Sequence, residues 1–161
     1  MKKWFGYIVL LLSVALLSAC GGGSQSSPTS RSLKSVIKTT ALTATLNIGG
    51  VQMAITLPAG VAPELKPDGS VNNAAAIEFI SSAPSTYTLQ NVTYNSAASE
   101  LNFSVIDLAG FTTEDQIVLH LKVLEGTPKE SDFSIKSYNF FDKVTGASIS
   151  GLNPTLTTTI L

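Results

Sequence analysis

Apolar and polar residues alternate along most of the chain after residue 40. Four apolar residues alternate with polar ones over 42–48, and four larger apolar residues again occupy every second position over 51–57. A period of two is typical of a strand with one buried face. Gly49 and Gly50 separate the two runs, and paired glycines favour two-residue hairpin turns because they accept a positive φ. The pattern therefore predicts a β-hairpin over residues 41–57.

The same alternation predicts further strands, and turn-forming residues separate them. Residues 58–73 read as a loop, whereas 74–80 fit either a helical turn or a strand. About 120 residues of short strands predict an all-β domain, a two-sheet antiparallel β-sandwich. The clearest remaining strands are predicted at 86–94, 101–106, 117–123, 133–141 and 156–161.

The first twenty residues have the order of a secretory signal. Lys2 and Lys3 precede an apolar run over 4–17, which is shorter than the roughly 20 residues that a membrane-spanning helix needs. The sequence LSAC at 17–20 resembles the lipobox of bacterial lipoproteins, which implies cleavage before Cys20 and acylation of that residue. A plain secretory peptide with an incidental cysteine is the alternative.

These features predict three regions. Residues 1–19 form a lipoprotein signal peptide, 20–40 the lipidated cysteine and a flexible Gly/Ser-rich linker, and 41–161 the folded domain. Several acyl chains would hold the protein on a membrane without spanning it, so we expect a lipid-anchored protein of the cell envelope. Gly21 stands where an aspartate would signal inner-membrane retention, and the resemblance therefore implies the outer membrane in a Gram-negative host.

Charge and cysteine content exclude several classes of function. Cleavage leaves eight Lys and Arg residues against eleven Asp and Glu, a formal charge of −3. The only arginine, Arg31, lies outside the predicted domain, so we expect no nucleic-acid binding. Without Cys20 the chain has no thiol for a disulfide, a thiolate metal site or a nucleophile.

Few residues suggest catalysis. His120 is the only histidine, and alternation over 117–123 places it on the outer face, where a zinc site or triad would lack a second histidine or cysteine. The segment 68–73 resembles an oxygen-ligand loop but lacks the closing glutamate of an EF-hand, and a simple turn is favoured. A glycosidase-type carboxylate pair stays open. We predict no enzyme activity, no metal and no cofactor.

Aromatic residues near the end of the chain offer a candidate contact. Tyr138 and Phe140 share one face of the strand predicted at 133–141. If Phe133, Ile135 and Phe141 face the core, Tyr138 and Phe140 form an exposed patch that a partner could bind. Coverage of this patch by a loop or by the tether is the alternative.

The second half of the chain resembles the cohesin family. The sequence LNFSVIDLAGFTTEDQIVLHLKVLEGTPKESDFSIKSYNFFDKVTGASISGL, residues 101–152, is similar to the strands, Gly-containing loop and acidic turn of cohesins. Cohesins are nine-stranded jelly-roll sandwiches that bind dockerin modules through one sheet face, and some carbohydrate-binding modules share their fold. The loop over 57–73 departs from the family because it lacks a Tyr-Asp-Pro-like element. No contact residue follows from the resemblance.

The resemblance and the exclusions lead to ordered hypotheses for function. The first is a membrane-anchored, non-catalytic scaffold module that recognises a protein partner. The second is a carbohydrate-binding module that binds polysaccharide, against which counts the position of the only tryptophan, Trp4, in the signal peptide. A small hydrolase is the third.

Overall fold

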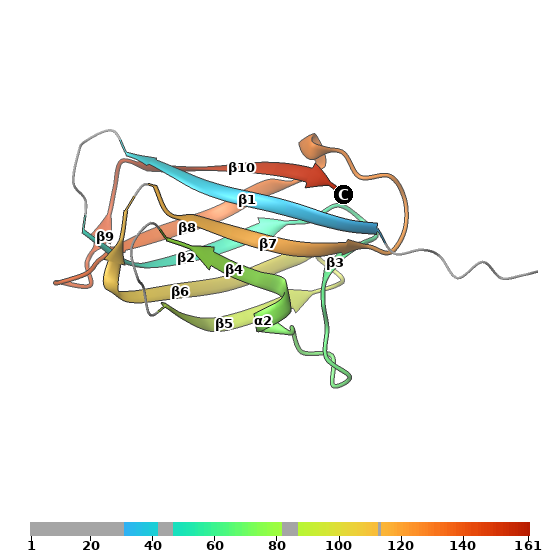
Figure 1. Ribbon diagram of the computed structural model, residues 1–161, viewed down its shortest axis with the longest axis horizontal. Coiled ribbons are helices and arrows are strands. Elements are labelled where there is room, and N and C mark those ends of the chain that lie inside the picture. Colours follow the sequence, from blue (N-terminus) through green and yellow to red (C-terminus); the bar gives the residue numbers. More distant parts are fainter. Residues whose placement is uncertain (1–30, 42–46, 82–86, 113) are drawn as a thin grey trace, which may run out of the picture.

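The chain folds into an all-β sandwich of two antiparallel sheets (Figure 1). The computed structural model describes residues 31–41, 47–81, 87–112 and 114–161. Two short helical turns, α2 (Asn73–Ala76) and η1 (Glu130–Asp132), lie between strands. The strands are β1 (Arg31–Ala41), β2 (Ile48–Thr56), β3 (Val61–Pro63), β4 (Ile77–Ile80), β5 (Tyr87–Asn95), β6 (Glu100–Phe111), β7 (Gln116–Val123), β8 (Ser134–Asp142), β9 (Ser148–Ile149) and β10 (Leu152–Ile160).

Each sheet joins strands that are far apart in the sequence. Sheet A has the order β10-β1-β7, and β3 and β4 pair one after the other with the remaining edge of β7. Sheet B has the order β5-β6-β2-β8-β9. All pairings are antiparallel. The chain therefore crosses repeatedly between the sheets, and the inner face of each sheet covers the other.

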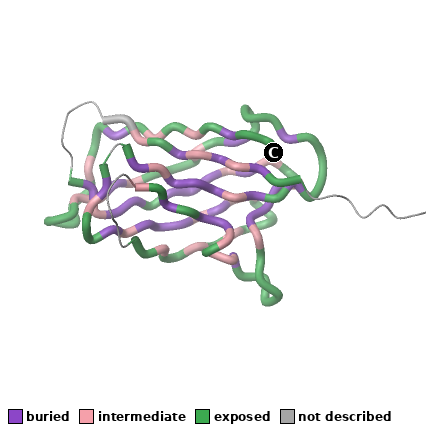
Figure 2. The backbone as a smooth tube through the Cα atoms, in the orientation of Figure 1, coloured by how far each residue is buried: buried purple, intermediate pink, exposed green. Residues whose placement is uncertain are grey.

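The core lies between the sheets and is built from alternate residues of each strand (Figure 2). Burial of each large apolar side chain contributes about 1.5–3 kcal/mol. One polar pair is buried with them: the hydroxyls of Ser35 and Thr158 lie 2.9 Å apart across β1 and β10 and satisfy each other. The largest fully buried side chains are Phe103, Leu33, Ile37, Ile48, Ile55, Leu57, Ile77, Leu101, Leu119 and Leu152.

The predicted domain boundary at residue 41 is wrong. Residues 31–40, assigned to the Gly/Ser-rich linker, belong to strand β1, which lies inside sheet A between β10 and β7. Leu33 and Ile37 are buried on its inner face, and Ser35 between them is buried with its hydroxyl paired. Because Ser35 is polar, the alternation of apolar and polar residues that predicts a strand is interrupted in this part of the sequence. Residues 1–30, including the predicted signal peptide and Cys20, lie outside the described residues.

The predicted hairpin turn at Gly49 and Gly50 is also wrong. Both glycines lie within β2, next to an irregularity in its pairing with β6 and β8. A Cβ added to Gly49 would come within 2.5 Å of the Lys143 Cα, so close backbone approach is what requires glycine here. Residues 42–46, which belong to the first half of that hairpin, lie outside the described residues.

The other predicted strands overlap strands of the structure, but β6 continues to Phe111, five residues past its predicted end, and the segment 58–73, predicted as a loop, contains β3. The ambiguous segment 74–80 contains both alternatives, since one helical turn, α2, leads directly into β4. The final strand begins four residues earlier than predicted, at Leu152.

Candidate binding surface

Of the two predicted contact residues, Phe140 belongs to the core. It is only 3% exposed, whereas Tyr138 is 45% exposed, and their rings pack edge to face at 5.8 Å. The shared face of the two residues is confirmed, but the exposed patch containing Phe140 is wrong. A register shift opposite Ala54 and Ile55 changes the phase of β8, so that Ile135 and Phe140 both face inward.

The same phase change places Phe141 on the outer face of sheet B. It pairs in register with Gly50, and a Cβ built on that glycine would lie 3.7 Å from the Phe141 ring. The aromatic side chain therefore covers the space that the glycine leaves. Sequence alternation alone could not reveal this, because the bulge has no composition signal.

The edge strand β10 is protected against pairing with another strand. Thr158 directs its N–H away from β1 to the Glu130 carboxylate, at 3.4 Å. Pro154 lies four residues earlier, on the same side of the strand, and has no N–H to offer. These features leave few donors for an added strand.

The other sheet edges are short or bulged. β3, β4 and β9 have three, four and two residues. β5 has a register shift after Gln90, where Asn91 takes a positive φ of 52°. β9 pairs only with Phe140 and Phe141, so the earlier part of β8 is a free edge. That part contains the bulge and the charged Lys136. A partner therefore has better access to the sheet faces than to the edges.

The outer face of sheet B carries rows of uncharged polar side chains. Strand register places Gln52 between Ser104 and Asn139, and Ala54 between Asn102 and Ser137. β5 extends the rows, because Gln90 pairs with Ser104 and Thr93 with Asn102. The two rows thus cross four strands and contain Gln90, Ser104, Gln52 and Asn139, followed by Thr93, Asn102, Ala54 and Ser137.

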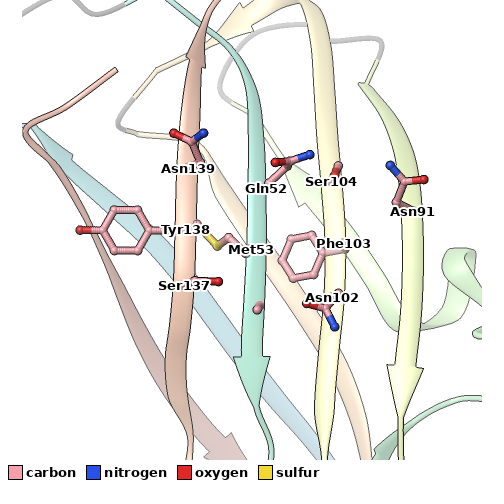
Figure 3. Close-up of a pocket in the computed structure, with 10 residues that line it drawn as sticks. Gln52, Met53, Asn91, Asn102, Phe103, Ser104, Ser137, Tyr138 and Asn139 are labelled. Atoms are coloured by element: carbon pink, nitrogen blue, oxygen red, sulfur yellow. The ribbon is translucent and has the colours of Figure 1, made fainter. Parts of the chain in front are cut away.

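The parts of these rows on β6, β2 and β8 line an open groove of about 410 Å³, to which β5 contributes Asn91 (Figure 3). Ala54 and Ser104 are buried at its floor, and the groove is open because their side chains are too small to fill it. Figure 3 shows the amides of Gln52, Asn102 and Asn139 around it, whereas the Tyr138 ring points away on the other side of β8. We refer to this feature as the polar groove.

One end of the polar groove is apolar. The next row in register consists of Thr88, Ile106, Gly50 and Phe141. Beyond it, Leu108 and Val144 are 79% and 80% exposed. A second hollow of about 320 Å³ lies among Gly50, Ile106, Leu108 and Phe141.

The opposite end of the polar groove is charged. Lys136 forms an ion pair with Glu100, whose side chain also hydrogen-bonds Asn102. The hydrogen bonds from Lys136 and from Asn102 lower the pKa of Glu100 below its ordinary value. Glu100 therefore stays ionised and fixes the orientation of Asn102 at the groove.

His120 faces outward on sheet A, as the alternation predicts. Its side chain is 43% exposed, and its Nε2 lies 2.9 Å from Glu78 Oε2 on β4. Sequence reasoning missed this partner because 42 residues separate the two and only the β4–β7 register brings them together. Among the described residues no group of three His, Cys, Asp or Glu side chains is placed to hold a metal ion.

The Asp68 loop is a turn. Asp68 Oδ1 accepts hydrogen bonds from the Ser70 backbone N–H at 2.9 Å and from the Ser70 hydroxyl at 2.7 Å. These bonds lower the pKa of Asp68. The geometry supports the turn interpretation of this segment.

Comparisons with protein-family models, curated proteins and solved structures found no match for the chain. Neither α2 nor η1, the helical segments of the described part, is long and apolar enough to cross a membrane. The surface itself therefore provides the argument for function.

Proposed function

We propose that this protein is a membrane-anchored, non-catalytic binding module that recognises a protein partner through the outer face of sheet B. The observation that carries the proposal is the polar groove with its apolar end, an open surface that mixes amides, hydroxyls and exposed apolar side chains. Protein interfaces combine an apolar centre with hydrogen-bonding groups in this way. The cohesin-like second half of the sequence points to the same use of a sheet face.

The groups on this face suit a protein surface. Asn139 Nδ2 donates to Ser148 Oγ at 3.1 Å, and Asn102 hydrogen-bonds Glu100. The amide groups that these bonds leave open, and the amide of Gln52, can pair with a partner's backbone or polar side chains without burying a charge. Phe141 and Leu108 at the apolar end provide the contacts on which binding energy concentrates. Since the sheet edges are blunted, we expect face-to-face recognition in place of strand addition.

A carbohydrate ligand is the second candidate. Amides and hydroxyls that line a groove of about 410 Å³ also match the hydroxyl groups of a sugar chain. The aromatic side chain beside the groove is Phe141, and no tryptophan lies in the chain after Trp4. The protein partner is therefore the primary proposal.

Membrane anchoring rests on the LSAC sequence at 17–20. We expect that Cys20→Ser yields protein without lipid that is lost from membrane fractions, whereas the wild-type protein carries label from a radioactive fatty acid. Retention of the variant in membranes, together with unlabelled wild-type protein, would refute the anchor.

The binding surface is tested by blocking the groove. Ala54→Arg places a large charged side chain at the buried floor, and Thr157→Arg introduces the same side chain on the exposed face of sheet A. A fragment of residues 21–161 is used to capture proteins from the host envelope, and each captured protein is identified, purified and titrated with both variants. The same fragment is applied to a glycan array in parallel.

We expect Ala54→Arg to weaken the purified complex by at least about tenfold, and Thr157→Arg to leave it unchanged, with folding of both checked by circular dichroism. Equal binding by both variants would exclude this face. Saturable glycan binding that Ala54→Arg abolishes, without a protein partner, would replace the protein by the carbohydrate.

A further inference from the structure

Positive charge is concentrated on three adjacent strands of sheet A. β10, β1 and β7 contain no carboxylate. They carry Arg31, Lys34, Lys38 and Lys122 together with His120. Among the described residues, the carboxylates that form ion pairs with these groups are Glu78 and Glu64, at the β3–β4 side of the sheet.

The two lysines at the centre of the outer face are free of ion pairs. In register, Lys34 lies between His120 and Thr159, and Lys38 lies between Gln116 and Thr155. Lys122 is paired with Glu64 at 3.0 Å, and His120 with Glu78. Within the described residues, no salt bridge reaches Lys34 or Lys38, so their charges are available to a partner.

The rest of the described chain has the opposite balance. Outside these strands and their two carboxylate partners it carries four lysines against nine aspartates and glutamates. The sandwich is therefore polarised, with a cationic outer face on sheet A and, on sheet B, a groove whose centre is lined by uncharged amides and hydroxyls. A polarised charge distribution orients a protein at a charged surface.

The position of β1 indicates what that surface is. Arg31, the first residue of β1, follows Cys20 by eleven residues, a stretch that can span at most about 40 Å. A lipid on Cys20 would thus hold the lysines of β1 close to the bilayer. At that distance the tether supplies a high effective concentration, so that even weak attraction orients the domain.

We propose that the outer face of sheet A docks on a bilayer that contains anionic lipid, an inference that rests on the proposed lipid anchor at Cys20. Lys34 and Lys38 meet the lipid phosphates, and the exposed hydroxyls of Thr157 and Thr159 on β10 donate hydrogen bonds to phosphate oxygens. Docking in this orientation turns the polar groove on sheet B away from the membrane, toward a partner.

The test measures which face is near the lipid. Lipidated full-length mature protein is reconstituted in vesicles of phosphatidylcholine, with or without about one third phosphatidylglycerol. Cys20 is the only cysteine and is acylated, so Thr157→Cys on sheet A and Ser137→Cys on sheet B each take a single fluorophore. Energy transfer to a headgroup-labelled lipid then reports the distance of each face.

With anionic vesicles we expect stronger transfer from position 157 than from position 137, and loss of this difference in 0.5 M salt, where the Debye length shrinks to about 4 Å. Each unpaired lysine near an anionic surface favours docking about fivefold. The double variant Lys34→Glu with Lys38→Glu reverses both charges and should therefore reduce the docked population at least about tenfold. The control pair Lys66→Glu with Lys129→Glu makes the same charge change elsewhere and should leave it unchanged.

Equal transfer from the two positions, or the same difference on neutral vesicles, would overturn docking while the anchor stands. Protein that is washed off the vesicles and shows no acylated Cys20 by mass spectrometry would instead refute the anchor, and docking with it.

Discussion

The assignment of β1 to the folded domain predicts a large effect of Ile37→Ala. Ile37 is 1% exposed and packs in the core between the sheets. The interior beside it, near Val51 and Ile117, leaves only about 20 Å³ of free space. Removal of the outer carbons of Ile37 therefore creates a cavity that the surrounding strands cannot fill without moving.

Loss of burial and formation of the cavity together should cost about 2–5 kcal/mol of the free energy of unfolding. For a domain of this size, that corresponds to a fall in Tm of roughly 6–20 °C. Val36→Ala is the matched control, because Val36 lies on the outer face of the same strand and is only partly buried. We expect the control to cost about 1 kcal/mol or less.

Urea unfolding of residues 21–161, followed by circular dichroism, measures both values. If residues 31–40 were a linker, both substitutions would change stability by less than about 0.5 kcal/mol, as is usual for exposed positions. Equal, small effects of Ile37→Ala and Val36→Ala would therefore refute the placement of β1 in the core.

Three further predictions concern polar groups. Ser35→Ala should cost about 1–3 kcal/mol in chemical denaturation because it leaves the buried Thr158 hydroxyl unpaired, whereas Ser35→Ala with Thr158→Val should recover much of that loss. The lowered pKa of Glu100 means that its stabilising effect is complete above the unfolded-state value of 4.5 and is lost as the pH falls through the folded pKa, so Glu100→Gln should flatten the acid limb of a stability–pH curve; an unchanged limb would contradict the role of Lys136. Glu130→Ala frees the Thr158 N–H on β10 and should increase self-association in size-exclusion chromatography; strictly monomeric variant would show that this carboxylate does not protect the edge.

Alternation predicted the strands best where inner positions are all apolar. The run over 117–123 places four apolar residues inward, and the structure shows them buried in β7. β1 has the same geometry but contains Ser35 at an inner position, where only the distant Thr158 explains its burial. The sequence of one strand does not reveal a hydrogen bond whose partner lies on another strand. The domain boundary predicted at residue 41 is wrong for that reason.

The failures at Gly49 and Phe140 have a related cause. Paired glycines suit a turn, yet they equally suit a place where two backbones meet, and the approach of Lys143 decides between these uses. The face of Phe140 depends on the bulge in β8, which adds one residue and reverses every later side chain. The local pattern predicts that a strand forms, but after a bulge it assigns the following side chains to the wrong face of the sheet.

The proposed sites were hidden for the same physical reason. The polar groove unites residues 52, 102 and 139 through antiparallel register, and the cationic face unites residues 34, 38 and 122 in the other sheet. None of these residues is unusual within its own strand, because outward positions of a sandwich are normally polar. Only the strand register brings them together, with uncharged amides on the outer face of sheet B and unpaired lysines on the outer face of sheet A. A lipid anchor that precedes β1 would bring the cationic face to the membrane, and the arrangement of strands would then turn the proposed polar groove away from it.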